Sequence, residues 1–310
     1  MQTWRSERTT AGSKIPQAAV SHLLLAVVLA TLSAFVAPAQ SPAADETPPL
    51  QKAASFKDYT ANTYFDPNSN TNGAYYEILK DHKRIYRQQA TESGEKFVIG
   101  TLYDDDPDAK LVTMGADITG EGRPDLVISE WSGGANCCLT FHIFEIGPKF
   151  RKIGDIEAEF GDQGPHFVHL GKAPGLQIQI YDWTFANWHS DFADSPAPKV
   201  ILQYKRGHYR FASNLMSTPS ADMKDVAVRI ENIPDKTQNL HGGSWPNAAI
   251  PPELWGTMLY LIYTGHRLVA WQVVDMSWPK SVNGKEAFVA DFTAQLKRSP
   301  YWNWVAQLGT

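Results

Sequence analysis

Residues 117–128 read DITGEGRPDLVI. Side chains with oxygen atoms stand at positions one, three, five and nine of this stretch, which are Asp117, Thr119, Glu121 and Asp125. Ca²⁺ takes about six to eight oxygen ligands, and a short loop with oxygens on alternate residues can wrap around one ion. The glycines at positions four and six allow the positive φ angles that so tight a loop requires. The stretch therefore predicts a Ca²⁺-binding loop that leads directly into a strand.

The predicted ligand set has five members. Asp117, Glu121 and Asp125 would supply carboxylates, Thr119 its hydroxyl or its backbone, and Arg123, at position seven, its carbonyl. The loop is not an EF-hand, because position twelve is isoleucine rather than a bidentate glutamate and a strand follows instead of a helix. The alternative is an Asp-Gly turn held by hydrogen bonds alone. A bound Ca²⁺ would be structural, because it would tie the loop to the sheet.

The loop resembles the calcium loop of FG-GAP and VCBS repeats, D-x-[DNT]-G-D-G-x-P-D-L, found in integrin-type β-propellers and in many exported bacterial proteins. It departs from that pattern at Glu121, where aspartate is usual. Residues 131–138, which read WSGGANCC, are similar to a G-G-A-[HN]-C-C stretch of exported bacterial proteins that carry the same loop. The resemblance implies blade-like β repeats in an exported protein, and it names no activity.

The first forty residues indicate an export signal. Three basic residues stand in 1–14, an apolar run covers 23–36, and 37–39 read APA, which suits signal cleavage. An uncleaved membrane anchor is the alternative, although the run is short for a spanning helix. We therefore predict a signal peptide over 1–39 and a periplasmic or secreted product without a membrane span after cleavage.

Length and charge narrow the class of protein. A chain of 310 residues has room for one large domain or two ordinary ones. The formal net charge is -5, so the chain lacks the basic character that nucleic-acid binding requires. We expect no nucleic-acid partner.

The two cysteines of the chain are adjacent, Cys137 and Cys138. In an oxidising compartment thiols normally pair. Neighbouring residues on a regular strand point to opposite faces, so a bond between them requires a distorted turn. We predict a disulfide between the two; buried thiols at the start of a strand are the alternative. A metal–thiolate site would need further cysteines.

Between about residues 56 and 211, short strands alternate with turn signals, which favours a meander-like β domain. Strands are predicted over 75–80, 84–88, 97–103, 111–115, 126–131, 139–146, 150–158, 176–183, 200–204 and 208–211. Residues 124–131 echo 175–183, and each segment ends in an acidic residue followed by tryptophan. This weak repeat and the hairpin spacing of roughly sixty residues predict two or three propeller-like blades, fewer than the roughly four of a closed ring.

The predicted fold class is α+β, mainly β, with a small helical domain at the C-terminus. The predicted segments after the signal are a linker over 40–55, a β domain with FG-GAP-like repeats over 56–212, a connector over 213–252 and a helical domain over 253–310. The connector holds a short helix over 219–233, capped by Ser220. Apolar residues at helical spacing predict helices over 253–273, broken at Gly265, and over 285–296.

Glu130 and Asp182 stand before tryptophans at equivalent positions of the repeat, where they could form a glycosidase-type carboxylate pair. Equivalence within a repeat is itself a structural explanation, so we assign no catalytic residue. We expect a non-catalytic binding or structural protein with structural Ca²⁺ and an unknown protein or glycan ligand of the cell envelope. A cell-envelope glycan hydrolase that uses Glu130 and Asp182 is the alternative.

Overall fold

The structure is a computed structural model that describes residues 48–66, 73–92, 94–102, 109–134, 138–158, 164–233, 243–248 and 250–309. The signal peptide predicted over 1–39 lies outside the described residues. Within the described ranges, no helix combines the length and the apolar character that crossing a membrane requires.

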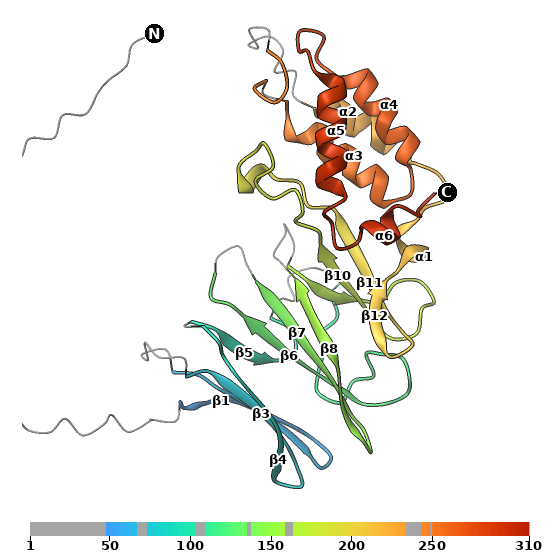
Figure 1. Ribbon diagram of the computed structural model, residues 1–310. Coiled ribbons are helices and arrows are strands. Elements are labelled where there is room, and N and C mark those ends of the chain that lie inside the picture. The colour runs from blue at the N-terminus through green and yellow to red at the C-terminus, as the bar shows by residue number, and fades with distance from the viewer. Residues whose placement is uncertain are drawn as a thin grey trace, which may run out of the picture. The chain divides into compact units, whose positions relative to one another are not determined.

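Strands dominate the described part of the chain, where they form three antiparallel sheets of four strands each. Each sheet is a meander of consecutive strands: β1-β2-β3-β4, β5-β6-β7-β8, and β12-β11-β10-β9. Figure 1 shows the sheets in blue, green and yellow, followed by orange and red helices. Among the described strands, these sheets form neither a propeller nor a closed barrel. The strands are β1 (Leu50–Phe56), β2 (Tyr59–Tyr64), β3 (Tyr75–Lys80), β4 (Lys83–Gln89), β5 (Lys96–Ile99), β6 (Asp125–Trp131), β7 (Leu139–Ile146), β8 (Phe150–Ala158), β9 (His166–Val168), β10 (Gln177–Tyr181), β11 (Lys199–Lys205) and β12 (His208–Phe211).

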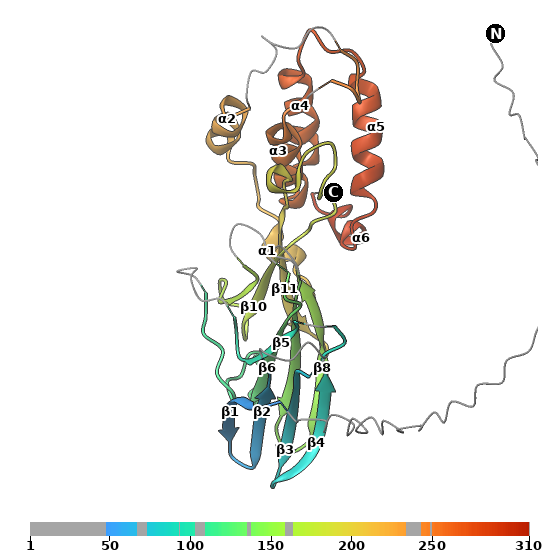
Figure 2. The ribbon, with the colours of Figure 1, turned by 90° about the vertical axis from the view of Figure 1, so that its left-hand side faces the viewer.

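The helices lie in the C-terminal third and pack beyond the third sheet, as Figure 2 shows from the side. The helix predicted over 285–296 is confirmed, and so is the break at Gly265, which has a φ of +89°. Asp222, not Ser220, caps the connector helix, because its side chain accepts the N–H groups of Lys224 and Asp225. The helices are η1 (Phe192–Asp194), α1 (Ser213–Met216), α2 (Met223–Glu231), α3 (Pro252–Tyr263), α4 (Arg267–Ser277), α5 (Lys285–Leu296) and α6 (Trp302–Val305).

The second sheet is buried on both faces. Along β6, Leu126 and Ile128 belong to the core shared with the first sheet, while Val127 belongs to the core shared with the third sheet and the helices. Residues 126–128 of β6 are therefore apolar in succession instead of alternating with polar ones. The helices and the third sheet share one core, and contacts along the chain group residues 47–310 into one compact unit.

Four strand assignments were wrong. Strand β2 was not predicted, although it alternates buried and half-buried residues. Strand β1 begins at Leu50, inside the predicted linker 40–55, and was missed because this edge strand exposes most of its side chains. Strand β9 was missed because it has only three residues. Residues 111–115 are not a strand: their flanking N–H groups bond to separate partners, with Lys110 donating to Phe167 and Gly115 to Asp125.

The loop before β6 contacts the loop before β10. The N–H of Leu176 donates to the carbonyl of Ile118 at 2.7 Å. Gly120 has a φ of +75°, and a Cβ there would lie 2.4 Å from the backbone N of Gly175. These two loops precede the second strands of consecutive sheets, so the positions related by the weak repeat meet at one junction.

We expect Gly120→Ala to lower the free energy of unfolding by about 3 kcal/mol or more. The substitution adds backbone strain of about 1–2 kcal/mol to a steric overlap worth about 1–3 kcal/mol. Gly122→Ala is the matched control, because Gly122 has nearly the same φ, +74°, and open space around its Cβ position. Urea unfolding of both variants is the measurement, and equal losses would contradict the close contact between the loops.

Candidate functional site

The 117–125 loop is built around the buried carboxylate of Asp125, which is 1% exposed. Its Oδ2 accepts the N–H groups of Ile118 and Thr119 at 3.0 and 3.1 Å, and the hydroxyl of Thr119 at 3.0 Å. Its Oδ1 is buried and has no hydrogen-bond partner among the described residues. One carboxylate oxygen thus organises the loop, while the other lacks a donor or a cation.

Asp117 closes the tip of the same loop. Its Oδ1 accepts the N–H groups of Gly120 and Glu121 at 2.8 and 3.1 Å, and its Oδ2 accepts that of Gly122 at 2.8 Å. The hydroxyl of Thr119 also lies 3.3 Å from Asp117 Oδ1. The loop therefore places Asp117 and Asp125 on either side of the Thr119 hydroxyl.

Glu121 and Arg123 face a separate polar network. Glu121 pairs with the guanidinium of Arg123 and accepts the hydroxyl of Tyr204 at 3.2 Å. Arg123 also pairs with Glu145 at 2.8 Å, and Arg151 pairs with the other oxygen of Glu145 at 2.9 Å. Because Tyr204 lies on β11, this network joins the second and third sheets.

Some of the predicted loop ligands, but not all of them, are placed to bind a cation. The orphaned Oδ1 of Asp125, with Asp117 and Thr119 beside it, suits a hard cation. Glu121 is held by Arg123 instead. Over the described residues, no cluster of three or more His, Cys, Asp or Glu is placed to hold a metal. Ca²⁺ binding stays a prediction, carried by Asp117, Thr119 and Asp125 more than by Glu121 and Arg123.

The Asp125 carboxyl has an unusual acidity. Burial raises its pKa from 3.8 to about 6, although the hydrogen bonds from Thr119 and Ile118 lower it. The folded chain therefore binds a proton that the unfolded chain releases between about pH 4 and 6. A shift of this size costs roughly 3 kcal/mol of folding free energy at neutral pH, since each pKa unit is worth about 1.4 kcal/mol. A cation at Oδ1 would offset that cost.

The hairpin turn after β6 holds Cys138. The hydroxyl of Ser132 accepts the N–H of Cys138 at 2.7 Å, and the indole N–H of Trp131 donates to the carbonyl of Gly134 at 3.0 Å. Cys138 is disulfide-bonded. Cys137, the only other cysteine of the chain, lies outside the described residues, so the bond between the two stays a prediction.

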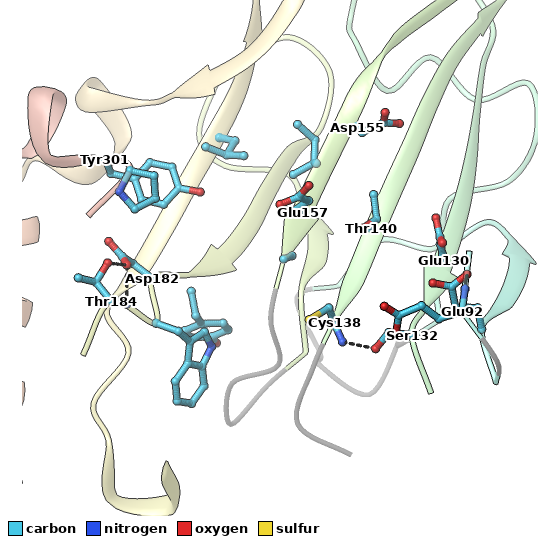
Figure 3. A pocket seen from close by; sticks show the side chains of 17 residues that line it. Glu92, Glu130, Ser132, Cys138, Thr140, Asp155, Glu157, Asp182, Thr184 and Tyr301 are labelled. Carbon is cyan, nitrogen blue, oxygen red and sulfur yellow. Dashed lines mark hydrogen bonds between the residues drawn. The ribbon is translucent and has the colours of Figure 1, made fainter. Parts of the chain in front are cut away.

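A second candidate site is a pocket of about 880 Å³ at the end of the second sheet, which we call the acidic pocket (Figure 3). Its walls come from β6, β7 and β8, from the end of β10, and from the segment before α6. No lysine or arginine is among the described residues that line it. Three aromatic residues line it, namely Tyr181, Trp183 and Tyr301. Six carboxylic residues line it: Glu92, Glu95, Glu130, Asp155, Glu157 and Asp182.

Glu130 and Asp182, the pair singled out in the sequence, both line this pocket, but Asp182 is fully engaged. The side chain of Asp182, which is 4% exposed, accepts the N–H and hydroxyl of Thr184 at 2.9 and 2.5 Å on Oδ1. Its Oδ2 accepts the hydroxyls of Tyr263 and Ser299. Asp182 therefore fastens β10 to the helices, and its oxygens are not presented to a substrate.

The floor of the pocket is a row of polar side chains across three strands. Thr140 on β7 is directly opposite Glu130 on β6 and Glu157 on β8, so all three lie on one face of the sheet. Figure 3 shows Thr140 between the two glutamates, with Asp182 and Tyr301 on the opposite wall. Burial, followed by the charges of Asp182 and Glu157, raises the pKa of Tyr301 to about 12.

Sequence analysis missed His142, which is buried on the same face of β7 as Thr140. It is one of two buried polar residues of β7, with Glu145, among buried apolar side chains. Its ring nitrogens lie 2.5 Å from Glu130 and 2.6 Å from Asp155. The signal that could have found it was this histidine at an inward-facing position of β7.

Comparison of this chain with known proteins finds no relative. No family model, curated protein or solved structure matches this chain. The chemistry of the two sites therefore rests on their own geometry.

We expect the unfolding free energy of the metal-free protein to fall as the pH rises from about 4 to 6, because the folded-state pKa of Asp125 is raised. At pH 7, Ca²⁺ should raise the melting temperature, since an ion that binds only the folded state stabilises it. Asp125→Asn should remove both effects, and Asp117→Ala should remove the Ca²⁺ response. Thermal melts with Ca²⁺ and with chelator test this; a melting temperature indifferent to both sinks the Ca²⁺ prediction.

Proposed function

We propose that this chain is an exported, non-catalytic binding protein whose acidic pocket takes the ligand. The observation that carries the proposal is the lining of the pocket, which combines six carboxylic residues with three aromatic ones. Export to the periplasm or the medium is proposed from the N-terminal signal pattern over 1–39. A structural Ca²⁺ at the 117–125 loop is part of the same proposal.

The four-stranded meanders support the proposed resemblance to FG-GAP-type blades. A propeller blade is a four-stranded antiparallel sheet, and each of the three sheets here has that composition. The Asp117 loop precedes the second strand of its sheet, and its degenerate counterpart precedes the second strand of the next. We propose that these sheets are blade-like units that have been joined to a helical end instead of closing into a ring.

The six carboxylates of the pocket fall into three groups. Glu130 and Asp155 contact His142. Glu95 accepts the N–H groups of Thr91 and Glu92, and Asp182 is engaged as described, so these two serve the structure. Glu92 and Glu157 are exposed. Exposed carboxylates at the mouth of a pocket favour positively charged ligands through electrostatic complementarity.

The aromatic wall narrows the ligand class. Trp183 stacks on Phe192 with ring centroids 4.7 Å apart, which holds its indole at the pocket wall. An ammonium group is attracted both by a carboxylate and by the face of an aromatic ring. A glycan that carries free amino groups presents ammonium groups on pyranose rings whose C–H faces can stack on aromatic side chains. We therefore propose an amino-bearing glycan of the cell envelope as the ligand.

We expect the tetramer of glucosamine to bind and its fully N-acetylated counterpart, which is uncharged, to bind much more weakly. Glu157→Gln should weaken binding of the charged tetramer roughly two- to fivefold, because a partly exposed ion pair contributes about 0.5–1 kcal/mol. Glu231→Gln is the control, since Glu231 is exposed on α2 and does not line the pocket. Isothermal titration calorimetry is the measurement; equal affinity for the two tetramers would contradict the proposal.

A glycan hydrolase that uses Glu130 and Asp182 is the second candidate, because both residues line one pocket. The engagement of Asp182 by Thr184, Tyr263 and Ser299 weighs against it, since an acid–base pair must reach the scissile bond. We expect the native protein to release no reducing ends from envelope glycans. Release that Glu130→Gln abolishes would establish the hydrolase instead, provided that the variant keeps the native melting temperature.

A further inference from the structure

His142 is bonded on both sides by carboxylates. The residue is 3% exposed and lies on β7, opposite Asp155 of β8. Its Nδ1 is 2.6 Å from Asp155 Oδ1, and its Nε2 is 2.5 Å from Glu130 Oε2. Glu130 and Asp155 line the acidic pocket and His142 does not; its buried ring lies beside the pocket, on the same face of the second sheet as Thr140.

Glu130, His142 and Asp155 form a hydrogen-bonded row, and counting its protons constrains its charge. An ionised carboxylate only accepts hydrogen bonds, and a neutral imidazole carries a single N–H. Two contacts as short as these require two protons, so a neutral ring between two ionised carboxylates would leave one pair of acceptors facing each other. The row of Glu130, His142 and Asp155 must therefore hold one proton more than a neutral histidine supplies.

The extra proton belongs on the ring. Asp155 also pairs with Lys152 at 2.8 Å, and although burial opposes it, the hydrogen bonds from Lys152 and His142 hold the pKa of Asp155 below its usual value. Asp155 is therefore ionised. Imidazole is intrinsically a stronger base than a glutamate carboxylate by about two pKa units, so the proton shared with Glu130 stays on His142.

The groups around the His142 ring favour its positively charged form, the imidazolium. Tyr76 of β3 and Phe97 of β5 face it with ring centroids 5.6 and 6.3 Å away. The side-chain amide nitrogen of Gln88 on β4 lies 3.4 Å from both Glu130 Oε2 and His142 Nε2, much farther than the 2.5 Å between His142 Nε2 and Glu130 Oε2. The titratable and charged groups that face the row are thus Tyr76, Glu130, Asp155 and, through Asp155, Lys152, whose ammonium donates to Tyr86. Carboxylates and aromatic faces both stabilise an imidazolium.

We infer that His142 is an imidazolium at neutral pH, and that it is the positioning residue that holds Glu130 and Asp155 at the floor of the acidic pocket and sets the pocket's charge. With the proton, the row carries one net negative charge; without it, two. Loss of the proton would also turn the contact with Glu130 into a repulsive one. The folded protein would therefore lose stability as the pH rises above about 6.5, where an unfolded histidine has already released its proton.

Nitrogen-15 NMR of the histidine rings in the full chain reads this state directly. Both ring nitrogens of His142, assigned in the native protein through NOEs from its ring protons to the rings of Tyr76 and Phe97, should carry protons at pH 7. His208, which is exposed on β12, is the internal reference for a histidine outside the row. One bare ring nitrogen at pH 7 in the native protein overturns the inference, and this readout does not require that His142→Gln folds.

Stability gives a second test that a merely space-filling histidine would not pass. The urea midpoint of the native protein should fall between pH 6.5 and pH 9, and His142→Gln should abolish the fall, whereas His208→Gln should leave it unchanged. An identical pH profile in native protein and His142→Gln overturns the inference.

Of this inference, only the assignment of the pocket's charge rests on the proposed function, because it is tested with the proposed ligand. If the glucosamine tetramer binds, His142→Gln should tighten its binding about two- to fivefold, opposite to the effect of Glu157→Gln, because it removes a positive charge. Weaker or unchanged binding by a folded His142→Gln variant overturns the assignment of the pocket's charge. Failure of the tetramer to bind any variant overturns the proposed function and leaves the NMR result standing.

Discussion

The buried carboxylate of Asp125 is the interaction on which the arrangement of the sheets depends. By accepting the N–H groups of Ile118 and Thr119, it turns the preceding loop so that the carbonyl of Ile118 faces the third sheet. That carbonyl then accepts Leu176 N–H and the hydroxyl of Tyr209. A short loop held from within thereby fixes the start of β6 and the start of β10 against each other. Burying a charge for this purpose is costly, which gives a physical reason for a cation at the loop.

The packing of the second sheet against its neighbours determines where the pocket forms. Both of its faces are used along most of its length, one by the first sheet and the other by the third sheet and helices. Only at one end, where Glu130, Thr140 and Glu157 lie in register, does a face open. Asp182 closes the far wall through its bonds to Tyr263 and Ser299, so helices distant in sequence complete the pocket. The pocket is therefore a product of the packing of three elements and not of any one motif.

The acidic residues of the pocket have different roles, and these roles explain why the geometry favours binding over catalysis. General acid–base chemistry needs a carboxyl that can reach the reacting bond and exchange a proton there. Asp182 and Glu95 are occupied by hydrogen bonds, and Glu130 is fixed by His142. What the pocket offers to a ligand is negative potential and aromatic surface, which suffices for recognition of ammonium groups.

The sequence alone determined most local structure and the importance of the Asp117 loop. Turn signals and apolar periodicity correctly placed β3, β7, β8 and α5, because those elements bury regular stripes of side chains. Sequence analysis did not predict the edge strand β1, because an exposed strand needs no alternation of apolar and polar residues. The tertiary structure decided which acidic residues meet: it showed Asp182 engaged by the helices, and it brought His142 between Glu130 and Asp155. Such meetings depend on strand register and on contacts between distant segments, and neither leaves a pattern in the chain.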